Sequence, residues 1–256
     1  MTTAGAKPPL AERVALVTGA SRGIGRGIAT RLARDGARVI VHYGTNSEAA
    51  AETVSAITAA GGRAFAVGQR LGVEGDIASL FERLDNELAG AGLDILVNNA
   101  GIAIDETLAD LTPEGYEQQF AVNTRAVLFI TQAAAARMNH GGRIISITSG
   151  TTLRALPEWL VYSMTKVAVE SMTRIVAAEL APRAITVNAV SAGIVDTDMN
   201  APWFVDKEQR EAAAQVAALG RIGLPADIAD VVAFLASEEA RWVTGHVVDA
   251  TGGSFL

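Results

Sequence analysis

The sequence has 256 residues, 50% of them hydrophobic and 19% charged, which excludes a disordered chain and suits a globular protein with a sizeable core. Because cysteine is absent, disulfide frameworks and thiolate zinc sites are excluded, which fits the cytoplasmic location that we expect. The net charge of −7 disfavours nucleic acid or an anionic membrane as the main partner, and no apolar run reaches the ~18 residues that span a bilayer.

Residues 1–11 are mostly polar and lack a signal-peptide core, so we expect a flexible N-terminal lead before one domain at 12–256. Apolar strand patterns then alternate with helical patterns. Strands are predicted at 14–17, 38–42, 64–67, 93–97, 143–148, 185–190 and 246–249. Helices are predicted at 23–34, 47–60, 74–89, 113–138, 159–180 and 226–236. This alternation predicts an α/β fold, a doubly wound parallel seven-stranded sheet flanked by helices, with ligands at the carboxyl ends of its strands.

The first strand–helix junction reads Thr18-Gly19-Ala20-Ser21-Arg22-Gly23-Ile24-Gly25. Glycines let the backbone approach a pyrophosphate, whose charge is favoured by the N–H groups and the dipole at a helix N-terminus. The same residues also match the Gly-x-Ser-x-Gly nucleophile elbow of hydrolases, which needs a later acid and then a histidine. His246 is the only late histidine, and the place on the first strand favours nucleotide binding.

Tyr162 and Lys166 are four residues apart on the predicted helix 159–180, so their side chains share one face. An ammonium beside a phenol favours the phenolate, and we therefore expect a lowered pKa for Tyr162. That would make Tyr162 a general acid and base. Alone, however, such a pair is more often structural.

Several ordered motifs together resemble the short-chain dehydrogenase/reductase family, most closely its 3-oxoacyl-carrier-protein reductase and ketoreductase branch. The resemblance runs from about Glu12 to the C-terminus and implies a single Rossmann-fold domain. Besides the glycine and tyrosine motifs, it depends on Asn98-Asn99-Ala100-Gly101, Asn123, Ser149, Arg221-Ile222-Gly223-x-Pro225-x-Asp227, and Thr244-Gly245 with Gly252-Gly253.

The resemblance implies an oxidoreductase with four catalytic residues. Tyr162 would protonate a carbonyl oxygen as hydride arrives from a nicotinamide, and Ser149 would hydrogen-bond that oxygen. Lys166 would hold the nicotinamide ribose and lower the pKa of Tyr162. Asn123 would anchor a water that reprotonates Lys166, or bridge a helix to a strand as a buried amide.

The cofactor is predicted to be NADP(H). The end of the second strand has no acid before Glu48, whereas chains that prefer NAD carry one there for the ribose 2′-hydroxyl. Arg22 is positioned as in NADP-preferring relatives and could grip a phosphate, although it could also be a solvated loop charge. The expected cofactor-binding residues are Gly19, Ser21, Arg22, Gly23, Ile24, Gly25, Tyr43, Asn46, Ser47, Leu71, Asn99, Ala100, Gly101, Tyr162, Lys166, Gly193, Ile194 and Thr197.

Two residues depart from the family pattern. Arg70 occupies the place of an aspartate that accepts a hydrogen bond from the adenine amino group, which an arginine cannot do. Ala192 replaces a proline after the sixth strand and predicts a looser lid over about 194–220. His42, His140 and His246 have no metal-ligand spacing, so surface or strand-end roles are expected and no metal site is predicted.

The predicted substrate is a hydrophobic or aromatic ketone of small to medium size, because the pocket residues are mainly apolar. They are Ser149, Thr151, Leu153, Trp159, Tyr162, Met199 and Trp203, with Phe204 nearby. Trp203 and Phe204 could instead pack the lid on the core. An alternative is a 3-oxoacyl group on a carrier protein or CoA, with Arg137, Arg174 and Arg183 near the mouth. A second alternative is an NADP-binding regulatory or scaffold protein. The resemblance also implies a homotetramer or homodimer.

Overall fold

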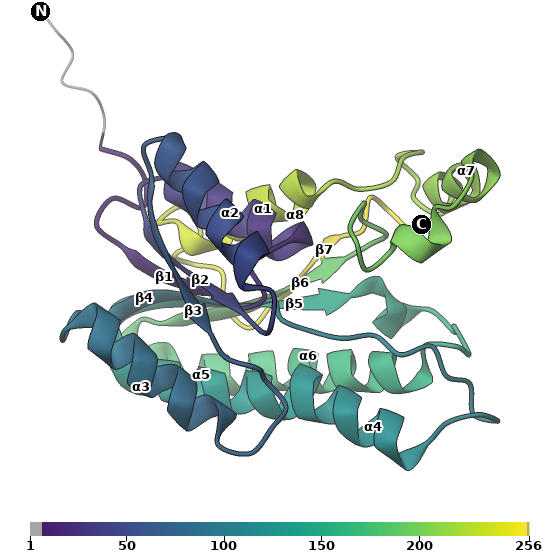
Figure 1. The fold of residues 1–256 in the computed structure, drawn as a ribbon, viewed down its shortest axis with the longest axis horizontal. Coiled ribbons are helices and arrows are strands. Elements are labelled where there is room, and N and C mark those ends of the chain that lie inside the picture. Colours follow the sequence, from purple (N-terminus) through teal and green to yellow (C-terminus); the bar gives the residue numbers. More distant parts are fainter. Residues whose placement is uncertain (1–6, 255) are drawn as a thin grey trace, which may run out of the picture.

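The computed structural model describes residues 7–254 and 256 and shows a parallel seven-stranded sheet in the order β3-β2-β1-β4-β5-β6-β7 (Figure 1). All seven predicted strands are present, and apart from the start of β5 their bounds lie within two residues of the prediction. The strands are β1 Val14–Val17, β2 Arg38–Tyr43, β3 Arg63–Gly68, β4 Leu93–Asn98, β5 Met138–Ser149, β6 Thr186–Ala192 and β7 Val247–Ala250.

Helices cover both faces of the sheet, with α1, α2 and α8 on one face and α3, α5 and α6 on the other (Figure 1). Their bounds are α1 Gly23–Arg34, α2 Ser47–Ala59, α3 Asp76–Leu88, α4 Pro113–Phe120, α5 Val127–Arg137, α6 Leu160–Leu180, α7 Lys207–Gln215 and α8 Pro225–Ala236. Among the described residues, no helix is both long and apolar enough to cross a membrane.

Successive residues of a strand pack into two separate hydrophobic cores, one on each face of the sheet. Val17 and Val41 pack under α1 and α8, whereas their neighbours Leu16 and Ile40 pack toward α3 and α5. Since side chains alternate across a strand, continuous apolar strands are what a sheet buried on both faces requires. The predicted doubly wound α/β sheet is therefore confirmed.

The sheet order reverses between β1 and β4, because the chain leaves β1 toward β2 and β3 and then returns to pair β4 with the other edge of β1. Where the connections after two neighbouring strands run in opposite directions, a crevice opens at the carboxyl ends of those strands, and ligands of such sheets bind there. The glycine turn after β1 and residues 99–101 after β4 lie at this crevice.

The predicted continuous helix 113–138 is wrong in one respect. Helices α4 and α5 are separated by a π-helical turn, η1, at Ala121–Ala126. Asn123 lies in that turn and its amide bonds both backbone groups of Ile102, which is outside the helix. The π-helical turn lets the Asn123 side chain reach Ile102, and turns of this kind are frequent at functional sites.

The N-terminal lead also differs from the prediction. Residues 1–6 lie outside the described residues, but Leu10 is buried in the core and its N–H donates to the carbonyl of Asp35 at 2.8 Å. An apolar side chain that finds a buried site stabilises the segment that carries it. Residues 7–11 are therefore packed against the domain at least through Leu10.

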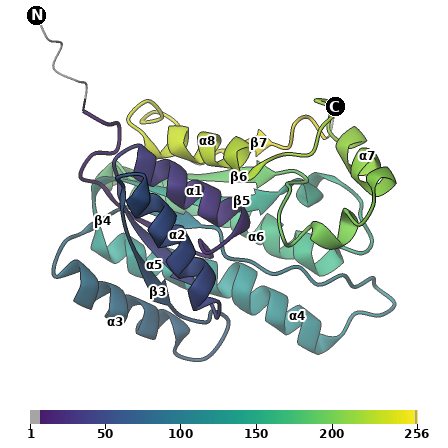
Figure 2. The same ribbon diagram turned by 45° about the horizontal axis from the view of Figure 1, so that its top comes forward.

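The segment expected to form a lid follows β6 and contains a 3-10 turn, Ala201–Trp203, and α7 (Figure 2). Asp206 caps α7, because its carboxylate accepts the N–H of Gln209 at 2.8 Å. Near its end, Leu219 donates to the carbonyl of Gly252 at 3.1 Å, which joins it to the C-terminal residues.

Candidate active site

The turn after β1 is compact enough to require glycine. At Gly19, whose φ is +63°, a Cβ would lie 2.9 Å from the Cα of Ala100. At Gly25 a Cβ would lie 2.2 Å from the carbonyl oxygen of Gly19. Helix α1 begins at Gly23 and no side chain among the described residues caps it. Its N-terminal N–H groups therefore remain available for an anion such as a pyrophosphate.

Thr18 and Asn99 lock this turn from the β4 side. The Thr18 hydroxyl accepts the N–H groups of Asn99 and Ala100, both at 3.0 Å. The Asn99 amide in turn donates to the carbonyls of Thr18 at 2.9 Å and Gly19 at 3.1 Å. The role of Thr18 in joining the turn to the segment after β4 was not predicted. The signal for it in the sequence is its place directly before the first glycine.

The opposite side of the turn is held by His42, and here the expectation of a surface or strand-end role is wrong in part. His42 is near the end of β2, but the residue is only 1% exposed. Its Nδ1 accepts the N–H of Gly19 at 3.1 Å, and its Nε2 is 2.9 Å from the carbonyl oxygen of Gln69. Burial lowers the pKa of His42 to about 4, so the ring is neutral at neutral pH.

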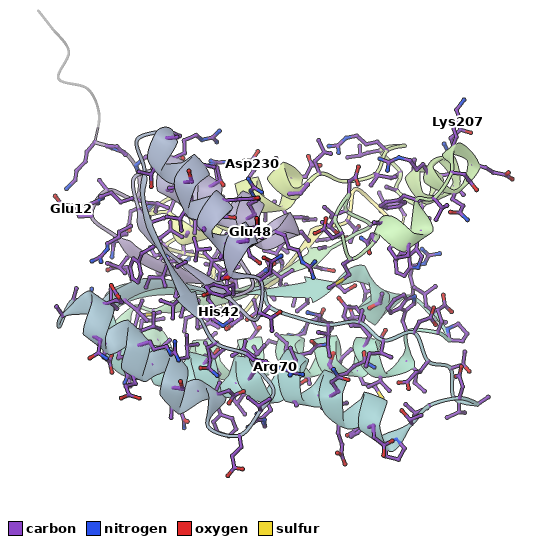
Figure 3. All side chains as sticks on the ribbon, viewed as in Figure 1. Glu12, His42, Glu48, Arg70, Lys207 and Asp230 are labelled. Atoms are coloured by element: carbon purple, nitrogen blue, oxygen red, sulfur yellow. The ribbon has the colours of Figure 1, made fainter. Side chains whose placement is uncertain are left out.

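Beyond the turn, Arg22 is exposed and lies 3.5 Å from the lid residue Asp198. Asn46 caps α2, since its Oδ1 accepts the N–H of Ala49 at 3.0 Å, and its amide nitrogen remains a donor. The Tyr43 ring packs on Gly68, where a Cβ would be 2.6 Å from the ring. Arg70 follows β3 and is exposed (Figure 3). No acid occupies the end of β2, as the sequence predicts.

The predicted catalytic residues meet where β5 ends and α6 begins. Ser149 is the last residue of β5, and its side chain is close enough to Tyr162 to act on the pKa of that phenol. Lys166 lies one helical turn further along α6, with its Nζ 5.4 Å from the centroid of the Tyr162 ring. Gly101 adjoins them, because a Cβ there would be 3.5 Å from the Lys166 Nζ. A hydroxyl pair beside an ammonium is an arrangement that can bind and protonate an oxygen.

Lys166 and Asn123 are also bound to backbone groups. The Lys166 ammonium donates to the carbonyl of Ile147 at 3.0 Å, a partner that the sequence did not predict. Asn123 bonds Ile102 through both ends of its amide and donates to the Thr165 hydroxyl at 3.2 Å. It therefore bridges η1 to the segment after β4 and to α6, as its structural interpretation requires.

The expected lowering of the Tyr162 pKa is not found in this structure. Burial raises the pKa of Tyr162 to about 12, with the Ser149 side chain acting in the opposite direction. Burial also lowers the pKa of Lys166 to about 8. The ammonium faces the ring and the Ile147 carbonyl, so it does not offset the burial of the phenol hydroxyl. At neutral pH Tyr162 therefore carries its proton, as a proton donor must.

An aromatic cluster extends from Tyr162 toward the lid. The Trp159 ring meets Tyr162 edge-on at 5.7 Å between centroids and meets Trp203 edge-on at 4.9 Å. Trp159 is buried, whereas Trp203 keeps 39% of its surface exposed. The structure thus brings the predicted substrate residue Trp159 to Tyr162, and Trp203 against Trp159. Edge-on aromatic contacts hold ring positions more firmly than apolar contact alone.

The other predicted substrate residues differ in their surroundings. Thr151 donates its N–H to the Ser149 hydroxyl at 3.2 Å, and its own buried hydroxyl has no partner among the described residues. Leu153 and Met199 are exposed. Phe204 is buried under Arg210, so its core-packing interpretation is the one that the structure supports.

The start of the lid rests on the glycine turn and on the C-terminal segment. A Cβ on Gly23 would be 3.3 Å from the Thr197 methyl, and a Cβ on Gly193 would be 2.7 Å from the carbonyl oxygen of Thr251. The carbonyl of Ile194 accepts the N–H of Gly223 at 2.9 Å. Ala192 pairs in the sheet with Ala250 of β7. The predicted cofactor-binding residues Gly193, Ile194 and Thr197 thus lie where the chain leaves β6 and enters the lid, and Thr197 is close to Gly23 of the glycine turn.

Comparison with known proteins places these features in context. A family model described as enoyl-(acyl carrier protein) reductase matches residues 19–254. Versicolorin reductase 1 of Aspergillus parasiticus is 40% identical over 254 residues, which cover 95% of this chain and 96% of that protein.

Two solved structures are similar over nearly the whole chain. The reductase LugOII, described as promiscuous and as catalysing keto-reduction at C1 in lugdunomycin biosynthesis, is 48% identical with a TM-score of 0.92 and covers 96% of this chain and 98% of its own. The angucycline C-6 ketoreductase LanV, solved with bound NADP, is 47% identical with a TM-score of 0.92 and covers 96% of each chain.

Proposed function

The chain belongs to the short-chain dehydrogenase/reductase family, and on that basis we propose that it is an NADPH-dependent ketoreductase in which Tyr162 donates the proton. The observation that carries the proposal is the position of Lys166 against the Tyr162 ring, with Ser149 beside Tyr162 at the end of β5. The reaction adds a hydride and a proton to a ketone and yields a secondary alcohol.

The residues around the crevice fit a dinucleotide. The glycine turn is so close-packed that no Cβ fits at Gly19 or Gly25, and no described side chain caps the N-terminus of α1. Gly19, Gly23 and Ile24 would hold the pyrophosphate, and Lys166 would hold the nicotinamide ribose. NADPH, when bound, supplies the hydride for the carbonyl carbon.

The chain's own side chains perform the rest of the reaction. Ser149 donates a hydrogen bond to the carbonyl oxygen and stabilises the charge that develops on it. Tyr162 gives its proton to that oxygen as the alcohol forms. The Tyr162 hydroxyl is protonated at neutral pH and so has a proton to give. Asn123 keeps the segment after β4 against α6 and so fixes the position of Lys166.

NADPH is proposed over NADH because of the residues that would meet the 2′-phosphate. Arg22 is an exposed guanidinium beside the N-terminus of α1, and Asn46 and Ser47 add donors at the start of α2. Arginine binds phosphate in a bidentate manner, and the end of β2 has no carboxylate that would repel the 2′-phosphate.

The substrate is proposed to be an aromatic ketone. Trp159 and Trp203 offer an aromatic wall that starts at Tyr162, and aromatic substrates pack on such walls. A carrier-protein substrate is less well supported, because two candidate docking arginines are already engaged. Arg137 is paired with Asp85, and Arg183 donates to the carbonyls of Ala135 and Met138.

A comparison of kcat/KM between substrates tests the proposal of an aromatic ketone. We expect kcat/KM with NADPH to be at least ~10-fold higher for a bicyclic aryl ketone than for acetoacetyl-CoA or an acetoacetyl carrier protein, since ring contacts are lost in the latter two. The initial rate of NADPH oxidation measures each value. A preference for either thioester would contradict the aromatic assignment but not the reaction class.

We further propose that two or four copies of the chain associate and that residues 194–220 act as the lid. Helices α5 and α6 carry several exposed apolar side chains, Leu128, Phe129, Met164, Val167 and Ile175. A patch of this kind commonly marks an interface, and a second copy would bury it. Sedimentation should find a dimer or tetramer at micromolar concentration, and a monomer would contradict the interface.

A further inference from the structure

One buried side chain at the crevice has no part in the chemistry described so far. His42 lies between the turn after β1 and the segment after β3, and its ring is almost fully buried (Figure 3). Besides the two ring contacts, its backbone carbonyl accepts the N–H of Ala20 at 2.8 Å. Residue 42 therefore bonds the glycine turn through both its side chain and its backbone.

The two ring contacts define a single chemical form of the imidazole. The N–H of Gly19 can only donate, so Nδ1 must be the acceptor. The carbonyl of Gln69 can only accept, so Nε2 must carry the proton. A neutral ring with its proton on Nε2 satisfies both backbone groups, and no other form does. An unsatisfied buried backbone group would cost stability.

The two backbone groups belong to opposite walls of the proposed dinucleotide site. Gly19 is in the turn that would hold the pyrophosphate, and its other side is held by Thr18 and Asn99. Gln69 directly precedes Arg70 and Leu71, the segment expected beside the adenine. Arg70 is exposed and has no carboxylate to offer, so this wall must be positioned by its backbone.

We propose that His42 is a positioning residue for NADPH, because its imidazole sets the spacing between the glycine turn and the adenine-side segment. The proposal depends on the proposed function only in taking this crevice as the dinucleotide site. Because His42 is distant from the reacting atoms, its loss weakens NADPH binding and leaves the chemical step at Tyr162 intact.

Three substitutions separate the two contacts. His42→Asn keeps an acceptor near the Nδ1 position and removes the donor to Gln69. His42→Gln places an amide donor near the Nε2 position and removes the acceptor for Gly19. His42→Leu removes both. The control is Thr173→Val, since Thr173 is equally buried but its hydroxyl bonds only the Val169 carbonyl within α6.

The measurements are the NADPH Kd by fluorescence titration of the ketone-free protein, kcat and KM for NADPH, and the melting temperature. We expect His42→Leu to raise Kd and KM by roughly 10-fold, with kcat nearly unchanged, and the Asn and Gln variants to lie between it and the wild type. Thr173→Val should change the melting temperature without changing Kd.

An unchanged Kd in folded His42→Leu would overturn the proposal, and so would a fall in kcat at unchanged Kd. If the leucine variant does not fold, the Asn and Gln variants decide, because each must then weaken Kd more than Thr173→Val does. The titration needs no ketone. A wild type that binds NADPH but reduces no ketone would refute the proposed function while leaving this test intact.

Discussion

Replacing Tyr162 with phenylalanine is expected to lower kcat for ketone reduction by roughly 10²–10⁴-fold, the usual contribution of a positioned proton donor. The substitution removes one hydroxyl and leaves the ring, so the edge-on contact with Trp159 and the packing of Lys166 over the ring remain possible. The NADPH Kd should therefore stay close to that of the wild type, and the loss should appear in kcat and kcat/KM together.

Steady-state kinetics with NADPH and an aryl ketone measure this effect. Tyr116→Phe is the matched control, because Tyr116 stacks on Phe120 in α4 at 4.5 Å between ring centroids and is outside the site. The control should keep the wild-type kcat. If Tyr162→Phe also kept its turnover, another group would have to supply the proton and the assignment of Tyr162 would fail.

Replacing Arg22 with alanine is expected to raise the KM for NADPH by roughly 10- to 100-fold, as the loss of a charge-assisted hydrogen bond to phosphate implies. NADH has no 2′-phosphate, so its KM should change little. The ratio of kcat/KM for the two cofactors measures the effect. The Arg22 side chain is exposed and pairs only at 3.5 Å with Asp198, so its removal should cost little stability.

Arg26→Ala controls for the general loss of positive charge near the turn. Arg26 is one helical turn further along α1 and lies 3.8 Å from Glu52. Its removal should leave the preference for NADPH in place. Equal losses with NADPH and NADH in the Arg22 variant would mean that Arg22 does not meet the 2′-phosphate.

The sequence was a good guide where local patterns determine the structure. The strand residues Leu16 and Val17 show why, because a continuous apolar run is needed when both faces of a sheet are covered. The glycine motif also predicted its own turn, since Gly19 and Gly25 tolerate no Cβ. The convergence of Ser149, Tyr162 and Lys166 followed from the family resemblance and not from periodicity.

Features that depend on distant partners were not predictable in this way. The apolar pattern at 113–138 does not show the π-helical turn, which depends on Asn123 reaching Ile102. The burial of His42 depends on the turn and on Gln69, far away in the sequence. The direction of the Tyr162 pKa was wrong because the spacing reveals the neighbouring charge but not the burial of the hydroxyl.

The most direct test of the account is to reduce an aryl ketone with NADPH fully deuterated at nicotinamide C4. If the chain is a ketoreductase with Tyr162 as proton donor, mass spectrometry should find deuterium on the carbinol carbon of the alcohol. Tyr162→Phe should form the same labelled alcohol roughly 10²–10⁴-fold more slowly. An alcohol without deuterium on that carbon, or no alcohol formed while NADPH binds, would contradict the central claim.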